Sequence, residues 1–121
     1  MLLRINNAPD DSYFVLTVSE DFDREGAKEM AIAVMQKSQE SEIKRVLIDL
    51  RAARNLDSVS DKFFFAHDDA REIQIDKTLQ VALLVDPSDQ SHDFVETVMR
   101  NTGHNILKFS DEQKAISWLR G

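Results

Sequence analysis

A short polar run at residues 57–60 has the residue types that could do chemistry. Asp57 stands eight residues after Asp49, which lies in the apolar segment 45–50, and Ser58 and Ser60 come next. A serine hydroxyl can accept a phosphoryl group, or it can accept a hydrogen bond from backbone N–H groups and begin a helix. The run therefore predicts either a phosphorylation site at Ser58 or Ser60 or an ordinary helix start.

Three aspartates are the candidates for acid–base chemistry. Asp49, Asp57 and Asp86 follow or end predicted strands, at the sheet edge where α/β proteins place ligands. No histidine or arginine is paired with them in the sequence pattern, and no Gly-x-Ser-x-Gly elbow is present. We therefore expect an exposed acidic rim and no catalytic residues, and we predict that the chain is not an enzyme.

Metal and cofactor sites are not indicated either. The chain has no cysteine, and its histidines, His67, His92 and His104, have no short spacing to one another. His92 and His104 are expected at the surface, near the two ends of one helix. No glycine-rich loop follows a predicted strand, which argues against a nucleotide-binding loop. We predict no cofactor and no metal.

The triplet Phe63-Phe64-Phe65 predicts an interaction surface. Each step along a helix turns about 100°, so one face cannot bury three successive side chains. We expect Phe63 and Phe64 in the core, and Phe65 either partly covered by a loop or exposed as an anchor for a partner. The predicted surface comprises Asp57, Ser58, Ser60 and Phe65, and it would bind an unknown protein or a second copy of the chain as a homodimer.

Charge and hydropathy exclude other classes of partner. The net charge is −7, and lysines and arginines are scattered, which argues against nucleic-acid binding. No apolar run approaches the roughly 20 residues of a membrane-spanning helix, so no membrane insertion is expected. The start of the chain does not resemble a secretory signal, and the absence of cysteine fits a cytoplasmic location.

The elements that must position these residues follow from the hydrophobic periodicity. Strands are predicted over 2–6, 13–18, 45–50, 80–85 and 106–109, and helices over 23–41, from 58, over 91–103 and over 110–119. Strands that alternate with helices indicate a parallel sheet, and the opening hairpin makes that sheet mixed. The predicted fold is one α/β domain, residues 1–121, with about five strands and four helices.

Serines are expected to begin three of the helices. Ser58 and Asp61 resemble a capping box, Ser110 and Gln113 form a second one, and Ser91 precedes another apolar face.

The stretch 47–61, LIDLRAARNLDSVSD, resembles the signature of STAS domains, the anti-sigma-factor-antagonist or SpoIIAA-like family. In that family a strand ending in Asp-Leu precedes Asp-Ser-Ser-Gly at a helix start, and here Asp49-Leu50 and Asp57-Ser58 match. Val59 occupies the phosphoacceptor position and Ser60 replaces the glycine. The segment 109–119 is similar to the tail of a divergent bacterial STAS/SEC14-like branch. The resemblance implies a SpoIIAA-like fold and a regulatory role.

Three functions remain open from the sequence. The first is a non-enzymatic, cytoplasmic protein-interaction module that uses the surface over 51–65. The second is a carrier for a small apolar ligand or lipid, by analogy with SEC14-like relatives, with a pocket near Phe64, Phe65 and Phe94. The third is an enzyme that uses the cleft of Asp49, Asp57 and Asp86.

Overall fold

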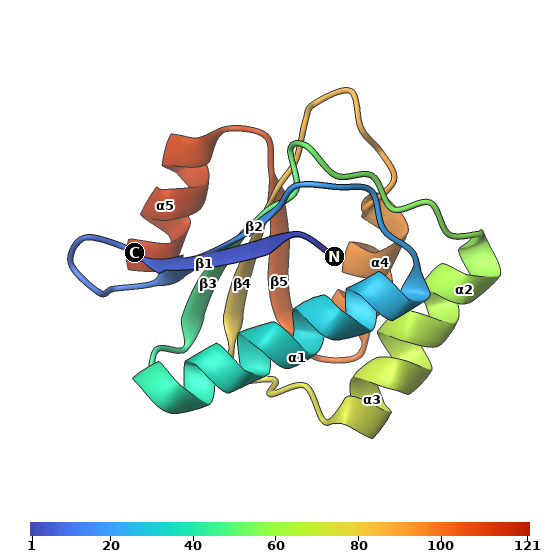
Figure 1. Cartoon of the computed structure of the whole chain (residues 1–121), viewed down its shortest axis with the longest axis horizontal. Helices are drawn as coiled ribbons and strands as arrows, with labels where there is room; N and C mark the ends of the chain where they lie inside the picture. Colours follow the sequence, from blue (N-terminus) through green and yellow to red (C-terminus); the bar gives the residue numbers. More distant parts are fainter.

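The computed structural model describes all 121 residues and contains one five-stranded sheet (Figure 1). The strands lie side by side in the order of the chain, β1 antiparallel to β2 and every later pair parallel. Their bounds are β1 Leu3–Asn7, β2 Phe14–Val18, β3 Arg45–Asp49, β4 Gln80–Leu84 and β5 Asn105–Phe109. The predicted mixed, mostly parallel sheet is confirmed.

Four helical segments accompany the sheet, as predicted. The second of them is continuous but changes its winding, from α2 through the π-helical segment η1 to α3. The bounds are α1 Arg24–Ser41, α2 Val59–Phe63, η1 Phe64–Asp69, α3 Ala70–Ile73, α4 Asp93–Asn101 and α5 Glu112–Arg120. No helix combines the length and the apolar character needed to span a membrane.

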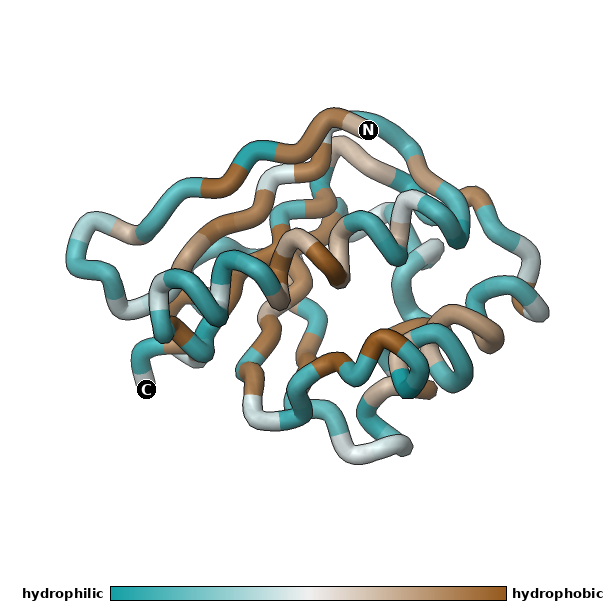
Figure 2. The backbone as a smooth tube through the Cα atoms, turned by 60° about the horizontal axis from the view of Figure 1, so that its bottom comes forward, coloured by the Kyte–Doolittle hydropathy of each residue, from teal (hydrophilic) through white to brown (hydrophobic).

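The order of the strands decides which face each helix covers. Parallel neighbours are joined by right-handed crossovers. Because the chain always steps in the same direction across the sheet, the three crossover helices share one face. α5 follows the last strand and covers the opposite face (Figure 1). Figure 2 shows hydrophobic segments along the strands and on the helix sides that face them, with hydrophilic loops at the ends.

Two separate cores result from this layering. Along β3, Val46 and Ile48 pack beneath the crossover helices, whereas Leu47 between them packs against α5. The first core is the larger, with 19 buried residues against 7 in the second. Strands buried on both faces explain why β3 and β4 read as continuous apolar runs instead of alternating ones.

Helix starts follow the predictions in part. Ser58 caps α2, since its hydroxyl accepts a hydrogen bond from the N–H of Asp61. The prediction for the last helix was wrong by one residue, because Asp111, not Ser110, accepts the N–H groups of Gln113 and Lys114. Ser91 does not cap α4, because its hydroxyl accepts the backbone N–H of Asn55 instead.

The aromatic triplet is oriented differently from the prediction. Phe65 is buried at 8% exposure, whereas Phe63 and Phe64 are exposed at 39% and 42%. A π-helical turn holds one residue more than an α-helical turn. In a regular α-helix, Phe63 would lie one turn before the buried Ala66 and would face the core as Ala66 does. The extra residue in the π-helical turn moves Phe63 off this inner face. Phe65 is thus not an exposed anchor, and the two phenylalanines before it face solvent.

Candidate functional site

The loop between β3 and α2 is fastened to the loops on either side of it. The N–H of Phe22 donates to the carbonyl of Arg54 at 3.0 Å, and the N–H of Leu56 donates back to the carbonyl of Phe22 at 2.9 Å. On the other side, the N–H of Asn55 donates to the hydroxyl of Ser91 at 3.0 Å. These bonds hold residues 54–56 in place, so the start of α2 is presented by a well-defined backbone.

Ser58 and Ser60 are both exposed at the start of α2. The hydroxyl of Ser58 is engaged in the cap described above. The hydroxyl of Ser60 makes no hydrogen bond within the chain, so of the two it is the freer to react.

Asp57 sits just before this helix start in an unusual environment. Its N–H donates to the side-chain oxygen of Asn55 at 3.0 Å, while its own Oδ2 is buried with no hydrogen-bond partner. Burial raises the pKa of the Asp57 carboxyl, a hydrogen bond from the backbone of Arg24 opposes this only in part, and the negative charges of Asp61 and Asp23 add to the rise. Perturbed carboxyls of this kind gather at binding sites more often than elsewhere.

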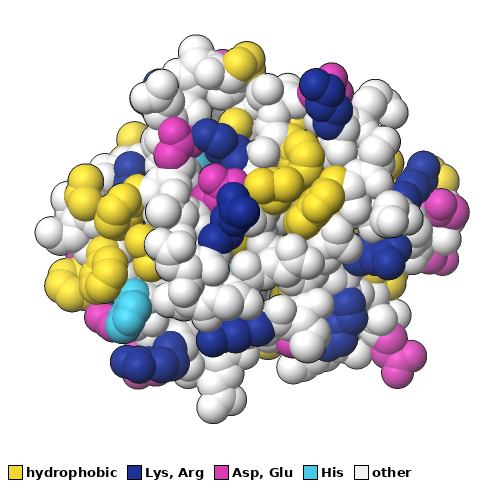
Figure 3. All heavy atoms as spheres, turned by 180° about the vertical axis from the view of Figure 1, so that it is seen from behind, with side chains coloured by type: hydrophobic (Ala, Val, Ile, Leu, Met, Phe, Trp, Pro, Cys, Tyr) yellow, Lys and Arg dark blue, Asp and Glu magenta, His cyan; other side chains and the backbone are white.

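Exposed apolar side chains follow these residues along the loop end and α2. We call the α2 patch the set Leu56, Val59, Phe63 and Phe64, whose exposures are 65%, 64%, 39% and 42%. The ring of His67 stacks on Phe63 with 5.0 Å between ring centroids. In Figure 3, hydrophobic side chains gather at the left of the view beside a histidine. Phe63 and Phe64 were expected in the core, so the patch was not predicted from the sequence.

An ion pair from α1 holds the helix beneath the patch. The guanidinium of Arg24 donates to both oxygens of Asp69, with distances of 2.7 and 2.9 Å. Asp69 is buried, and the hydrogen bonds from Arg24 hold its pKa below the usual range. The same guanidinium lies 5.5 Å from the ring centroid of Phe64. Arg24 thus couples the buried and exposed sides of η1, a contact that sequence spacing does not reveal.

His92 is buried, so the expectation of a surface histidine was wrong. Its Nε2 donates to the carbonyl of Ala53 at 2.8 Å and lies 3.3 Å from an oxygen of Asp89. Its ring stacks on Phe22 with 5.8 Å between centroids. Burial lowers the pKa of His92, and the hydrogen bond and Asp89 oppose that effect only in part. His92 therefore acts as a neutral anchor for the loop after β3.

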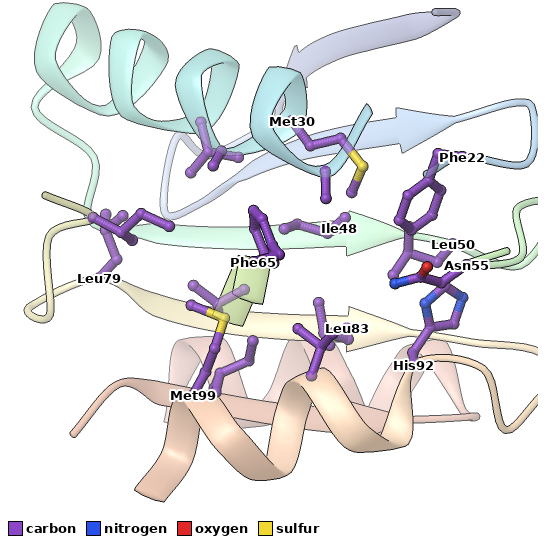
Figure 4. A pocket seen from close by; sticks show the side chains of 17 residues that line it. Phe22, Met30, Ile48, Leu50, Asn55, Phe65, Leu79, Leu83, His92 and Met99 are labelled. Carbon is purple, nitrogen blue, oxygen red and sulfur yellow. The ribbon is translucent and has the colours of Figure 1, made fainter. Parts of the chain in front are cut away.

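A cavity of about 100 Å³ lies in the larger core, between the sheet and the helices α1, η1 and α4 (Figure 4). Of its 17 lining residues, 15 are hydrophobic, and Asn55 and His92 supply the polar end near the carboxyl ends of β3 and β4. The predicted pocket near Phe64, Phe65 and Phe94 is therefore only partly right. Phe65 lines the cavity, whereas Phe64 and Phe94 do not.

The three candidate catalytic aspartates do not form one cluster. Burial alone would raise the pKa of Asp49, but hydrogen bonds from Arg51 outweigh it and leave that pKa lowered. Asp86 accepts hydrogen bonds from the backbone and the hydroxyl of Ser88. The charged neighbours of Asp57 are Asp23, Asp61 and Lys62, not Asp49 or Asp86. An acid–base pair built from these residues finds no support in the geometry.

Comparison with known proteins gives matches at the level of structure. Neither a protein-family model nor a curated protein sequence matches the chain. An anti-sigma factor antagonist from Mycobacterium paratuberculosis superposes with a TM-score of 0.64 at 18% identity, over 99% of this chain and 94% of that one. An uncharacterised protein with a SpoIIAA-like fold from Shewanella loihica gives 0.60 at 21% identity, over 98% and 92%. The unphosphorylated anti-sigma factor antagonist SpoIIAA gives 0.56 at 13% identity, over 99% of both chains.

These likenesses show that the chain has the SpoIIAA-like fold. They cover nearly the whole length of both partners, so the predicted fold is confirmed from β1 to α5. The identities are low, and the fold alone follows from them. What the chain does must therefore be argued from its own residues.

Proposed function

We propose that this protein is a non-enzymatic, regulatory protein-interaction module. Its contact surface would be the α2 patch together with Asp57, Ser58 and Ser60. The observation that carries the proposal is the exposure of four large apolar side chains in the loop end and first turns of one helix. Exposed apolar patches of this kind mark interaction sites in soluble proteins, and aromatic side chains dominate binding energy.

The chemistry of the surface specifies the kind of partner. Asp57 and Asp61 flank the apolar side chains, and the whole chain has a net charge of −7. A complementary partner would offer an apolar pocket bordered by lysine or arginine side chains. Two of the structural relatives are described as anti-sigma factor antagonists, which supports a regulatory role exercised through protein contacts. A cytoplasmic location belongs to the same proposal.

A capture experiment tests this surface. The immobilised chain is incubated with a lysate of its source organism, and bound proteins are quantified for the wild type, Phe63→Ser, Asp57→Lys and Ile32→Ser. Ile32 is the matched control, because it is 45% exposed but lies on α1. We expect a partner whose capture falls at least about tenfold for Phe63→Ser, since a hot-spot contact contributes roughly 2 kcal/mol. Asp57→Lys should also weaken capture, and Ile32→Ser should leave it unchanged.

Equal capture by all variants would show that the proposed surface is wrong. Loss of the same partner with Ile32→Ser would point to a general apolar adsorption and would count against the proposal as well. Thermal denaturation of each variant establishes that it is folded before capture is compared.

Phosphorylation of Ser60 is a further part of this proposal. Ser60 is exposed and its hydroxyl is unbonded, whereas Ser58 is engaged as a cap. A phosphate would add about −1.5 to −2 charges beside Asp57 and Asp61. It would strengthen the negative rim and change partner choice, while the helix start tolerates the charge. Incubation with lysate and ATP should add a phosphate to the wild type and to Ser58→Ala, but not to Ser60→Ala.

A second candidate function, carriage of a small apolar ligand, is supported by the cavity in the larger core. Its lining is almost entirely hydrophobic. Apolar cavities of about 150 Å³ bind benzene, so a volume of about 100 Å³ suits a smaller guest. Native mass spectrometry of the purified protein should show a bound apolar species under this function. A spectrum with the bare chain mass alone would contradict it.

A further inference from the structure

A second hollow lies along the same continuous helix as the α2 patch, toward the C-terminal end of that helix. It has a volume of about 280 Å³ and is formed by η1, α3, the loop that leads into β4 and the turn between α4 and β5. Its polar lining comprises His67, Arg71, Gln74, Lys77, Thr102 and His104. These residues come from two segments, 67–77 and 102–104, that are distant in the sequence and meet only in the folded chain.

The charge of this hollow is opposite to that of the molecule. Two permanently charged side chains and two imidazoles line it, and no aspartate or glutamate does. The chain as a whole has 22 acidic and 15 basic residues, so a lining without acids is not the average surface. Arg71 and Lys77 form no ion pair with any carboxylate of the chain, although carboxylates are the more numerous groups.

The nearby carboxylates are occupied elsewhere. Asp76 precedes Lys77 but accepts hydrogen bonds from Lys44 and Thr78. Asp68 pairs with the ring of His67 at 2.8 Å, on the rim of the hollow. The positive charge of Arg71 and Lys77 is therefore not neutralised from within the protein. In Figure 3, Lys and Arg side chains lie along the lower edge of the molecule, next to the histidine at lower left.

The backbone places Lys77 against the turn that carries His104. Gly103 has a φ of +97°, and a Cβ built on it would lie 3.8 Å from both Cδ and Nζ of Lys77. Burial lowers the pKa of His104, and the charge of Lys77 lowers it further. A neutral imidazole thus lies beside an unpaired ammonium group. An anion bound at this point would favour protonation of that imidazole.

From this geometry we propose that the hollow binds a phosphate group, either free or as a monoester of a small molecule. Arg71 supplies a planar guanidinium that suits two phosphate oxygens, and Lys77 supplies a point charge from the other side. Gln74 offers a neutral amide donor on the same lining. His104 gains a proton when the anion binds, which adds a third charge. Arg71 and Lys77, which supply the charge, belong neither to the α2 patch nor to the lining of the apolar cavity.

Isothermal titration calorimetry at pH 7 and low ionic strength tests the site with two probes, inorganic phosphate and phenyl phosphate. The variants are Arg71→Gln and Lys77→Gln, both at exposed positions, and the matched control is Lys114→Gln on α5, across the sheet. We expect each pocket variant to lose affinity about tenfold or more, because a charge-assisted hydrogen bond is removed. The control should stay within about twofold, a difference below 0.5 kcal/mol by the same relation.

Tighter binding of phenyl phosphate would identify a monoester as the ligand class, and equal binding would identify the free anion. The proposal is overturned if neither probe binds more tightly than acetate at matched ionic strength. It is also overturned if all three variants weaken binding equally, since that pattern reports net charge alone.

The titration of His104, followed by NMR, gives a separate readout. Saturating phosphate should raise the pKa of His104 in the wild type and in Lys114→Gln, and should have less effect in Lys77→Gln. If the pKa of His104 does not move while phosphate binds, the anion sits elsewhere and the assignment of this hollow fails.

Discussion

At the scale of single residues, buried polar groups hold the loops in place. The ring of the buried His92 donates to the carbonyl of Ala53, lies close to the carboxylate of Asp89 and stacks on Phe22. Its side chain is only 3% exposed. A neutral imidazole can be accommodated there because its N–H has a partner. A charged one would lose hydration that the site does not replace.

The buried imidazole makes stability depend on pH. The folded chain holds the pKa of His92 below the ordinary 6.5, so the unfolded chain binds the proton more readily. The free energy of unfolding should therefore fall as pH is lowered from 7 through 6.5, and this effect should level off below the folded pKa. Urea denaturation at several pH values measures it. In His92→Gln this part of the slope should disappear; an unchanged slope would mean that other groups cause it.

Asp76 gives a second residue-level prediction. Hydrogen bonds from Lys44 and then Thr78 lower its pKa to about 2. Replacement of the ammonium by an apolar group in Lys44→Met should raise that pKa toward 3.8, the ordinary value of the carboxyl. NMR titration of the Asp76 carboxyl carbon checks the shift. Lys28→Met is the control, because Lys28 pairs with Glu25, not with Asp76.

At the scale of elements, the π-helical turn η1 has the largest consequence. It directs Phe65 into the core and leaves Phe63 and Phe64 outside. Phe65→Ala should lower the free energy of unfolding by about 3–5 kcal/mol, since it removes a buried ring beside an existing cavity. Phe64→Ala should cost less than about 1.5 kcal/mol, because that ring is partly exposed. Chemical denaturation measures both; equal losses would contradict the assigned orientation.

The elements themselves follow from the sequence to a large extent. All five strands and the four helical segments are found close to where the apolar periodicity puts them. Which side chains of the second helix face the core could not be predicted from the sequence. The π-helical turn adds one residue and so shifts every earlier position of the helix relative to the core. The burial of His92 depends on Ala53, 39 residues away in the chain, a pairing that local spacing cannot indicate.

The candidate site was predicted only in part. Asp57, Ser58 and Ser60 were expected at a helix start and lie there, because a serine that begins a helix has a local pattern. Phe65 was misplaced, and Arg71, Lys77 and His104 were not connected to one another. Their convergence depends on how β4 and β5 align, which is a property of the folded sheet.

At the scale of the whole molecule, the larger core is incompletely filled. The cavity lies where α1, η1 and α4 meet the sheet (Figure 4). Val34→Ile would add one methylene group to a lining residue while keeping its branching. We expect a gain in the free energy of unfolding of about 1 kcal/mol, near the value of one buried CH₂. A loss of stability, measured by denaturation, would mean that the side chains already touch at this point. Val46→Ile, away from the cavity, is the control and should not stabilise.

The sequential strand order bears on how the protein is made. Each strand pairs only with neighbours that are adjacent in the chain, so the sheet can be assembled stepwise as the polypeptide leaves the ribosome. The three crossover helices can close their side as they emerge. The other side, with Leu47, Ala82 and Leu84, has no helical cover until α5 has been synthesised. A nascent chain stalled before residue 112 would therefore expose this apolar surface to solvent. Chaperones that recognise exposed apolar surface would bind the chain most readily at this stage.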